Sequence, residues 1–367
     1  MFILKLINRN NRIAKLIIAG LAAMVLISCS QTSEEVSFDK PSVENTMLLL
    51  DWIEQTGDYT NSSEFPSILD AAEVYAWRDE NILLIDLRPY EHYRAGHIEH
   101  AINLRPGEVM HFFRNKIDPP AFKSIIFTCN TGMLSSYVTS VLRNLGYNNT
   151  FAMRYGMSGW DRSIAEQYWL ANTGDQFEGK LEQTNNPMMQ AGLLPAIENK
   201  GNDGFMLAVS QAEKVLSESP DEFMISIDEL SKDLVKYYIV CYWSDDKCSE
   251  AGHLPGAVRY EPKRSLTRDS FLNTLPTDRP IVIYCNSAHQ SSFVTAYLRM
   301  LGYDARSLIY GANGFIYKTM MRLEPNPRRT FKEGFIQNLP LVTEKNRQPE
   351  PESKDIEIEK TTIQGGC

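Results

Sequence analysis

The chain has 367 residues, 43% of them hydrophobic and 23% charged, a composition typical of a folded protein with two or three domains. Its formal net charge of −9 argues against nucleic acid or an anionic lipid surface as a binding partner. We expect neither a cofactor nor a bound metal ion.

The first 28 residues have the pattern of a secretory signal peptide. Lys5, Arg9, Arg12 and Lys15 form a basic start, and residues 16–27 form an apolar run. This run is shorter than the roughly 20 apolar residues that a membrane-spanning helix needs. Removal of the segment would make the remaining chain more acidic, because it carries basic but no acidic side chains.

The apolar run leads directly into Cys29 through the order Leu26-Ile27-Ser28-Cys29. This order resembles a bacterial lipobox, in which the chain is cut before the cysteine and a lipid is attached to its sulfur. An ordinary signal peptide or an uncleaved anchor, each with an incidental cysteine, is the alternative. We expect a lipoprotein of the bacterial cell envelope, on the periplasmic side or in the outer membrane, that touches the membrane through its lipid alone. Residues 29–60 would form a tether and a leading helix.

The rest of the chain carries one pattern twice, at an offset of 156 residues. Residues 124–147 read SIIFTCNTGMLSSYVTSVLRNLGY and residues 280–303 read PIVIYCNSAHQSSFVTAYLRMLGY. The two segments are identical at 12 of 24 positions, including Cys129 and Cys285. The same offset aligns Gly96-His97-Ile98 with Gly252-His253-Leu254. The sequence therefore predicts two copies of one domain.

Apolar strands alternate with helices in the first copy. A helix is expected to open at Pro66-Ser67-Ile68, and residues 82–85 are expected to form a buried strand that ends at Asp86. Residues 150–153 are a further strand candidate. This alternation predicts an α/β fold, in which each copy is a mainly parallel sheet flanked by helices.

Cys129 is predicted to lie between a strand and a helix. Residues 125–128 are a short apolar run, and Val138, Val141, Leu142 and Leu145 share one face of a helix that Gly146 ends. Unpaired N–H groups and the positive end of the helix dipole favour negative charge on a sulfur atom at this point. Free cysteines are often just small buried hydrophobic residues, but the recurrence of this one at Cys285 favours a reactive thiol.

The motifs of the first copy, in their order, resemble those of the rhodanese family. They are Asp86-Leu87-Arg88, Glu91, Gly96-His97-Ile98, Cys129-Asn130-Thr131-Gly132, Leu145-Gly146-Tyr147, and Gly156 with Trp160. The resemblance implies two tandem rhodanese-like domains with sulfurtransferase activity. In that family a cysteine takes up a sulfane sulfur as a persulfide and passes it to a nucleophile such as cyanide or a thiol. By resemblance, Cys129 and Cys285 are the catalytic residues.

The substrate is expected to meet the loop after Cys129 and two arginines. The residues predicted to bind it are Asn130, Thr131, Gly132, Met133, Leu134, Ser135, Arg88 and Arg154. Neither cysteine loop carries the arginine or lysine that family loops often have, which puts binding of dianionic thiosulfate in doubt. Met133 and Leu134 suggest an apolar pocket mouth, better suited to a polysulfide, a thiol persulfide or a protein partner. Asp86 and Arg88 are expected to form a mainly structural ion pair.

The second copy departs further from the family pattern. Asp86 and Arg88 align with Tyr242 and Ser244, and Gly132 aligns with Ala288. These differences slightly favour the first copy as the active one, or leave both competent. His289 is interpreted either as a group that titrates near neutral pH and favours the thiolate of Cys285, or as an exposed residue without a role.

The other cysteines suggest a disulfide and a mobile thiol. Cys241 and Cys248 are candidates for a local disulfide in an oxidising envelope, and a redox-active or metal-binding pair is the alternative. Cys367 ends residues 344–367, whose low apolar content predicts a disordered tail. It is incidental, a mixed-disulfide site, or an arm that carries sulfur to or from Cys285.

Two functions remain open from the sequence. The first is a lipid-anchored sulfurtransferase whose partners are a sulfane-sulfur donor and a thiol or protein acceptor. The second is a catalytically weak or inactive rhodanese-like module that docks a redox or membrane partner. A phosphatase of related fold is disfavoured, because Ser135 and Ser291 stand where it needs an arginine. The predicted domains are residues 61–172 and 206–343, joined by a linker at 173–205 with some helix around 188–197.

Overall fold

A computed structural model of the chain describes residues 40–198, 203–323 and 329–343. The predictions for the signal peptide, for the lipid on Cys29, and for the tail with Cys367 fall outside the described residues. No described helix has the length and apolar character that crossing a bilayer requires.

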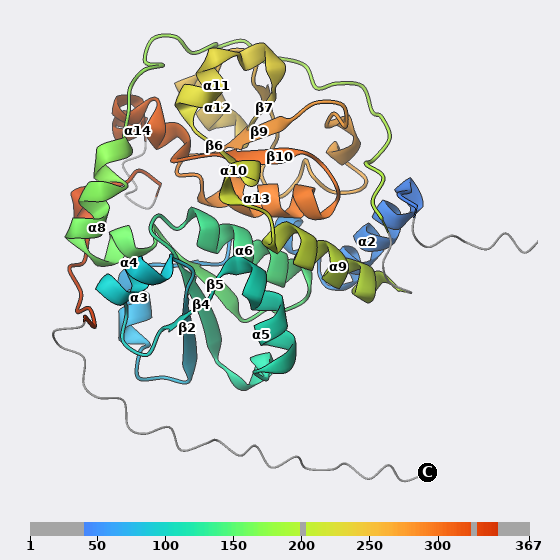
Figure 1. Cartoon of the computed structure of the whole chain (residues 1–367). Helices are drawn as coiled ribbons and strands as arrows, with labels where there is room; N and C mark the ends of the chain where they lie inside the picture. Colours follow the sequence, from blue (N-terminus) through green and yellow to red (C-terminus); the bar gives the residue numbers. More distant parts are fainter. Residues whose placement is uncertain (1–39, 199–202, 324–328, 344–367) are drawn as a thin grey trace, which may run out of the picture. The chain divides into compact units, whose positions relative to one another are not determined.

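The described residues form two five-stranded parallel sheets, one in each copy (Figure 1). The first sheet has the order β1-β5-β4-β2-β3, made of β1 (Ile68–Leu69), β2 (Ile82–Asp86), β3 (Ile102–Asn103), β4 (Ser124–Thr128) and β5 (Thr150–Met153). The second has the order β6-β10-β9-β7-β8, made of β6 (Met224–Ile225), β7 (Tyr238–Cys241), β8 (Val258–Arg259), β9 (Ile281–Tyr284) and β10 (Ala305–Leu308). The identical strand order confirms the predicted fold class and the predicted duplication.

Helices flank both sheets. Those before and within the first copy are α2 (Val43–Gln55), α3 (Ala71–Ala76), α4 (Tyr90–Ala95), α5 (Val109–Asn115), α6 (Met133–Asn144), α7 (Met157–Trp160) and α8 (Arg162–Gln167). Those of the second copy are α9 (Gly204–Leu216), α10 (Pro220–Phe223), α11 (Ile227–Lys232), α12 (Asp245–Ala251), α13 (His289–Met300) and α14 (Tyr317–Leu323). Short 3-10 turns are η1 (Tyr59–Asn61), η2 (Pro106–Glu108), η3 (Pro119–Ala121), η4 (Leu170–Asn172), η5 (Leu234–Lys236), η6 (Leu272–Thr274), η7 (Gly311–Gly314) and η8 (Glu333–Phe335).

The start of the first copy differs from its prediction. Ile68 and Leu69 form the edge strand β1, which pairs with Ala152 and Met153 of β5, and so no helix opens there. Helix α3 begins after Asp70, where a capping box replaces the expected proline start. A two-residue strand leaves no periodic signal in a sequence, and its pairing partner comes from a distant part of the chain.

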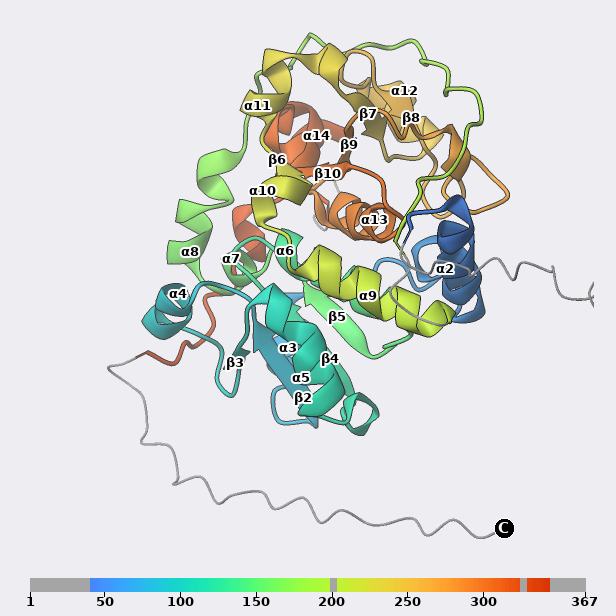
Figure 2. The same ribbon diagram turned by 45° about the vertical axis from the view of Figure 1, so that its right-hand side comes forward.

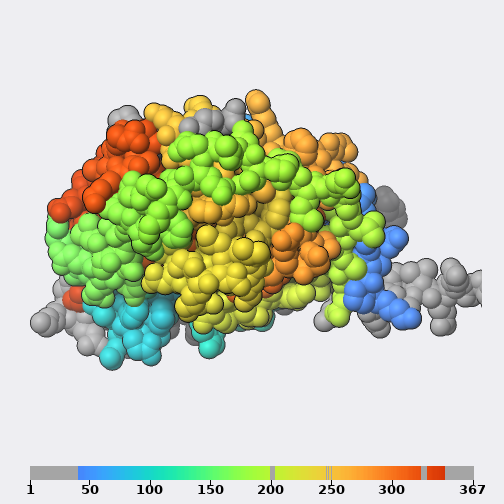
Figure 3. All heavy atoms as spheres, turned by 90° about the horizontal axis from the view of Figure 1, so that it is seen from above, coloured from blue at the N-terminus to red at the C-terminus, as the bar shows by residue number. Residues whose placement is uncertain are grey.

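The linker also differs from its prediction, because residues 188–197 contain no helix. The linker runs over the surface of the second copy, where Figure 3 shows its green atoms lying across yellow and orange ones. Gly192 N–H donates to the Asn273 carbonyl oxygen at 2.8 Å, and Glu182 exchanges backbone bonds with His253. These bonds join the extended linker to the second copy and pair some of its backbone groups.

Alternate residues of the central strands enter two different layers. Ile125 and Phe127 of β4 pack with α6 in one core cluster, whereas Ile126 packs in another cluster on the opposite face of the sheet. In the second copy, Ile281 and Ile283 of β9 belong to the same core cluster as the residues of α6. The two copies therefore share one apolar core.

Helices α6 and α13 lie against each other inside this shared core (Figure 2). Ser140 Oγ–H of α6 donates to the Phe293 carbonyl oxygen of α13 at 2.7 Å. Because each helix begins just after one of the two cysteine loops, their packing also places the two loops near each other.

The last described residues return to the first copy. Leu339 N–H donates to the Trp160 carbonyl oxygen, and Trp160 Nε1–H donates to the Pro340 carbonyl oxygen at 2.9 Å. His97 and Val342 exchange backbone bonds. The end of the predicted range 206–343 thus covers the first copy. The side chain of Trp160 is buried in the core.

Candidate active site

Cys129 lies between the end of β4 and the start of α6, as predicted. Its Sγ accepts a hydrogen bond from Gly132 N–H at 3.1 Å, and its thiol donates to Ser135 Oγ at 3.7 Å. Ser135 donates in turn to the Gly132 carbonyl oxygen at 3.1 Å. The helix is capped by Gly132 and not by a serine side chain. This loop directs a backbone donor at the sulfur, and Cys129 itself is only 4% exposed.

The loop requires glycine at two positions. Gly132 has φ +87°, and a β-carbon there would lie 2.3 Å from His289 Nε2 of the second copy. Gly156 has φ +56°, and a β-carbon there would lie 2.1 Å from the Cys129 carbonyl oxygen. In the second copy Ala288 takes the place of Gly132 and adopts φ +61°.

The remaining loop residues mostly hold the loop to the body of the protein. The Asn130 carbonyl oxygen accepts Ser158 Oγ–H at 2.8 Å, and the Thr131 carbonyl oxygen accepts Trp169 Nε1–H at 3.0 Å. Leu134 is half-buried. Met133 is 2% exposed and packs against the second copy, so it does not line the apolar pocket mouth that the sequence suggested.

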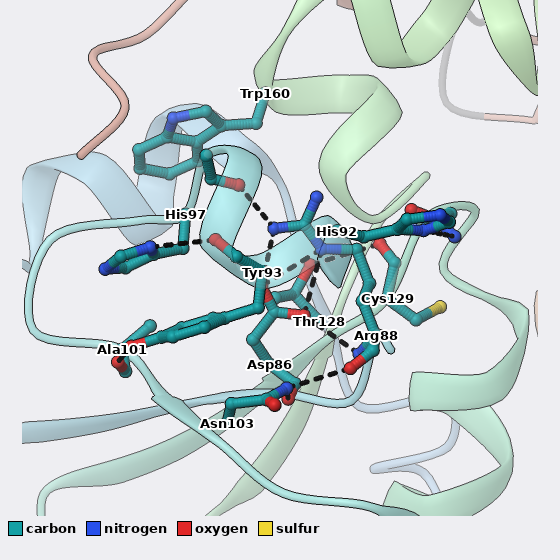
Figure 4. A network of polar contacts seen from close by, with 12 residues as sticks. Asp86, Arg88, His92, Tyr93, His97, Ala101, Asn103, Thr128, Cys129 and Trp160 are labelled. Carbon is teal, nitrogen blue, oxygen red and sulfur yellow. Dashed lines mark hydrogen bonds and ion pairs between the residues drawn. The ribbon is translucent and has the colours of Figure 1, made fainter. Parts of the chain in front are cut away.

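Arg88 and Asp86 form a buried ion pair beside this loop (Figure 4). Arg88 Nη2 lies 2.7 Å from Asp86 Oδ2 and donates to the Gly96 carbonyl oxygen at 2.6 Å. Asn103 Nδ2 donates to the backbone carbonyl oxygens of both residues at 2.8 Å. The expected structural pair is confirmed. Arg88 also lines a cavity of about 160 Å³ together with Asn130, so the structure places it next to the loop without placing it at the sulfur.

Cys285 occupies the equivalent place between β9 and α13 and opens onto a cavity. Its Sγ accepts Ser291 N–H at 3.4 Å. Although Cys285 is only 2% exposed, it lines a cavity of about 250 Å³ together with its loop neighbours Ser287 and His289. Cys129 does not line this cavity, nor the cavity beside its own loop that contains Arg88.

Two arginines from other parts of the chain line the cavity of Cys285. Arg154 follows β5 of the first copy, and Arg329 follows α14. Arg154 Nε donates to Asp70 Oδ1 at 2.5 Å, so the Asp70 carboxylate offsets part of the positive charge of Arg154. The sequence predicted Arg154 as a substrate-binding residue without assigning it to one of the two cysteines, and it lines the cavity of Cys285. The tertiary structure thus gives the cavity of Cys285 a positive charge that its own loop does not carry.

The equivalent place in the first copy is apolar. By the repeat alignment, Arg154 corresponds to Ile309 and Ile68 corresponds to Met224. Ile309 and Met224 pack in one apolar cluster with Met133. The two copies therefore differ at this place, because an apolar cluster in the first stands where the second has an arginine beside its cavity.

His289 is buried, and neither interpretation drawn from the sequence holds. Its side chain is 1% exposed, and burial, with the nearby charge of Arg154 as a second cause, lowers the pKa of His289 to about 3. The ring is therefore neutral near pH 7. Its Nε2 accepts Tyr155 N–H of the first copy at 2.9 Å.

Cys241 and Cys248 lie together as buried thiols. Their sulfurs are 3.6 Å apart, whereas a disulfide bond is about 2.05 Å long. Burial raises the pKa of the Cys241 thiol. The two thiols are hydrogen-bonded neighbours without a disulfide in this structure, and the disulfide stays a prediction.

Three residues of the second site escaped the sequence analysis. Ser287 aligns with Thr131, and this shared hydroxyl was a usable signal. Arg329 and Tyr155 left no such signal, because nothing in the surrounding sequence links either residue to the loop of Cys285.

This geometry, with a cysteine between strand and helix in each of two equal domains, agrees with the comparison to known families. A model described as rhodanese-like domain matches residues 70–163 and 219–318, together more than half of the chain. The chain therefore belongs to the family of proteins with rhodanese-like domains and carries that domain twice.

Two curated relatives match part of the chain. The protein named thiosulfate sulfurtransferase GlpE of Pseudoalteromonas translucida (strain TAC 125) is 30% identical over 89 residues, covering 24% of this chain and 81% of that protein. The uncharacterized protein YibN of Escherichia coli (strain K12) is 28% identical over 81 residues, covering 22% of this chain and 57% of that protein. The matched region therefore spans little more than half of YibN.

The solved structures that resemble this chain are more distant in sequence. A thiosulfate sulfurtransferase from Pseudomonas aeruginosa is 17% identical with a TM-score of 0.28, covering 74% of this chain and 47% of that one. SseA from Escherichia coli, described as a 3-mercaptopyruvate sulfotransferase, is 15% identical with a TM-score of 0.24, covering 68% of this chain and 98% of that one.

Proposed function

We propose that this protein is a lipid-anchored sulfurtransferase of the bacterial cell envelope that moves sulfane sulfur through a persulfide on Cys285. The observation that carries the proposal is the cavity of about 250 Å³ that joins the Cys285 thiol to Arg154 and Arg329. Membership of the rhodanese-like family supports the class of reaction. The name of the Pseudoalteromonas relative supports thiosulfate as the first donor to test.

In the first half-reaction, the Cys285 thiolate attacks the outer sulfur of thiosulfate. A bond forms between the two sulfurs, the sulfur–sulfur bond of thiosulfate breaks, and sulfite leaves with the bonding electron pair. Cys285 then carries a persulfide anion. Ser291 N–H, which reaches the sulfur at the start of α13, supports negative charge there.

In the second half-reaction, an acceptor thiolate attacks the outer sulfur of the persulfide. The acceptor leaves as a persulfide, and the Cys285 thiolate returns as the leaving group. The two displacements share one covalent intermediate, which predicts ping-pong kinetics. The acceptor belongs to the chemical class of thiols, on a small molecule or on a protein.

The arginines give the cavity its preference for an anionic donor. Guanidinium groups bind oxyanions through charge-assisted hydrogen bonds, which are roughly twice as strong as neutral ones. The Asp70 carboxylate offsets part of the positive charge of Arg154. Arg329 lines the same cavity and brings a second guanidinium group to it. The reason to doubt thiosulfate, which was the absence of a cation from the loop itself, therefore no longer applies to Cys285.

Intact mass spectrometry tests the proposal. The reduced protein is incubated with thiosulfate and, separately, with polysulfide. We expect a gain of one sulfur atom that Cys285→Ser abolishes and that Cys129→Ser retains. If no cysteine gains sulfur from either donor, the alternative of a non-catalytic binding module is favoured. If only Cys129→Ser abolishes the gain, the first copy is the active one.

The cellular location forms a separate part of the proposal and rests on the sequence around Cys29. In bacteria that process lipoproteins, the full chain is expected in the membrane fraction with a lipid-modified Cys29 as its first residue. Cys29→Ser should lose the lipid. An unmodified Cys29 in the purified mature protein contradicts this part and leaves the sulfur chemistry untouched.

A further inference from the structure

A row of hydrogen-bonding groups leads from the first copy to the cavity of Cys285. Tyr155 N–H donates to His289 Nε2 at 2.9 Å, and His289 Nδ1 lies 2.9 Å from Ser287 Oγ. The three residues are 1%, 1% and 6% exposed in that order. Ser287 and His289 line the cavity itself.

The direction of these bonds is determined by the first of them. A backbone N–H can only donate, so His289 Nε2 must accept with its lone pair. A neutral imidazole then carries its proton on Nδ1, and this N–H donates to Ser287 Oγ. The Ser287 hydroxyl keeps its own hydrogen for a third group, and Ser287 lines the cavity.

We propose that Ser287 is an obligatory hydrogen-bond donor to the oxyanion of the sulfur donor, and that His289 is the positioning residue that sets this direction. The inference rests on the proposed function and names a residue that recognises the anion beside Arg154 and Arg329. If the Ser287 hydroxyl could either donate or accept, the cavity would also bind ligand groups that donate hydrogen bonds. We call the hydrogen bonds from Tyr155 through His289 to Ser287 the relay. The relay makes the cavity selective for ligand groups that only accept hydrogen bonds, such as sulfonate oxygens.

The first copy has the same framework without the relay. Met133 occupies the place of His289, and its Sδ accepts Tyr310 N–H at 3.5 Å. A thioether has no hydrogen to pass on, and Thr131 Oγ1 instead accepts the backbone N–H of Met133 at 3.4 Å. The relay is therefore specific to the copy whose cavity contains the arginines.

Thiosulfate binding in a Cys285→Ser background, where no sulfur can be transferred, measures the relay directly by calorimetry. Ser287→Ala removes the donor and should weaken thiosulfate binding by roughly tenfold or more, as for a hydrogen bond to a charged group. His289→Gln can still accept Tyr155 N–H but cannot also donate to Ser287. It should weaken binding to a similar degree while the thermal midpoint stays close to that of the parent.

Two further measurements separate the relay from a general structural effect. His289→Gln should add no further loss when Ser287 is already alanine, because both changes remove the same donor. Nitrogen NMR of the ring should show the tautomer with the proton on Nδ1. An Nε2–H tautomer, or additive losses in the double variant, overturns the relay.

The outcomes also distinguish the relay from the sulfurtransferase proposal. Sulfur uptake on Cys285 combined with unchanged thiosulfate affinity in Ser287→Ala sinks the relay alone. Thiosulfate binding that depends on Ser287, combined with no sulfur uptake, supports the relay and sinks the transfer reaction. A Cys285→Ser protein that does not bind thiosulfate at all overturns the relay.

Discussion

Tyr155 N–H of the first copy donates to His289 Nε2 of the second copy at 2.9 Å. In the equivalent contact, Tyr310 N–H of the second copy donates to Met133 Sδ of the first copy at 3.5 Å. Both tyrosines hold left-handed backbone angles, with φ +59° at Tyr155 and φ +62° at Tyr310. Each copy therefore supplies a backbone donor to the start of the helix that follows the cysteine loop of the other. Neither loop has all of its contacts without the other copy.

Arg154 is expected to govern the use of anionic donors. Arg154→Ala should raise KM for thiosulfate by roughly tenfold or more, because a charge-assisted contact to the oxyanion is lost, and Arg154→Lys should recover part of this. Initial rates measured over a range of thiosulfate concentrations check the effect. Arg114→Ala is the matched control, since Arg114 lies on α5 and pairs with Glu213. An Arg154→Ala enzyme with the parental KM would contradict the assignment.

Gly132 is expected to tolerate no side chain. Gly132→Ala should destabilise the protein by at least about 1–2 kcal/mol, the usual cost of a left-handed angle, with a further loss from the close approach to His289. Ala288→Gly is the matched change in the second copy, where alanine already has φ +61°. It should leave stability unchanged or raise it slightly. Denaturant unfolding measures both, and equal effects in the two copies would refute the argument.

The buried histidine predicts acid sensitivity. The pKa of His289 falls from its ordinary value of 6.5 to about 3 in the folded protein. Between these two pH values the histidine is protonated in the unfolded chain and neutral in the folded one. Its contribution to stability is complete above pH 6.5 and is lost as the pH falls towards 3, by at most about 1.4 kcal/mol per pH unit. Unfolding free energies measured from pH 7 to pH 4 check this. His289→Gln should flatten the slope, and a variant with the parental slope would assign it to other groups.

The Asp86–Arg88 pair is expected to matter for stability. Asp86→Ala leaves the Arg88 guanidinium buried without its partner and should cost about 3–5 kcal/mol of unfolding free energy. The exposed pair of Lys232 and Glu229 is the control, and Glu229→Ala should have no measurable effect. Chemical denaturation of both variants decides the matter. Similar losses in the two variants would show that burial of the ion pair is not the cause.

Local patterns in the sequence were sufficient to predict the part of the fold that occurs in both copies. The apolar runs before Cys129 and Cys285 are strands, the helices after them lie where the periodicity placed them, and both halves have the same sheet. The edge strand at Ile68 and the extended linker were mispredicted, because their hydrogen-bond partners lie far away in the sequence.

The sequence by itself determined that this protein has two rhodanese-like domains, each with a cysteine at the end of a strand, since that pattern depends on neighbouring residues. Only the tertiary structure decided which cysteine meets a charged cavity. Arg154 reaches the cavity of Cys285, and His289 becomes a buried neutral ring, because α6 and α13 pack against each other and bring one copy over the loop of the other. Contacts between residues more than 100 positions apart leave no periodicity in a single sequence, and here those contacts determine the chemistry.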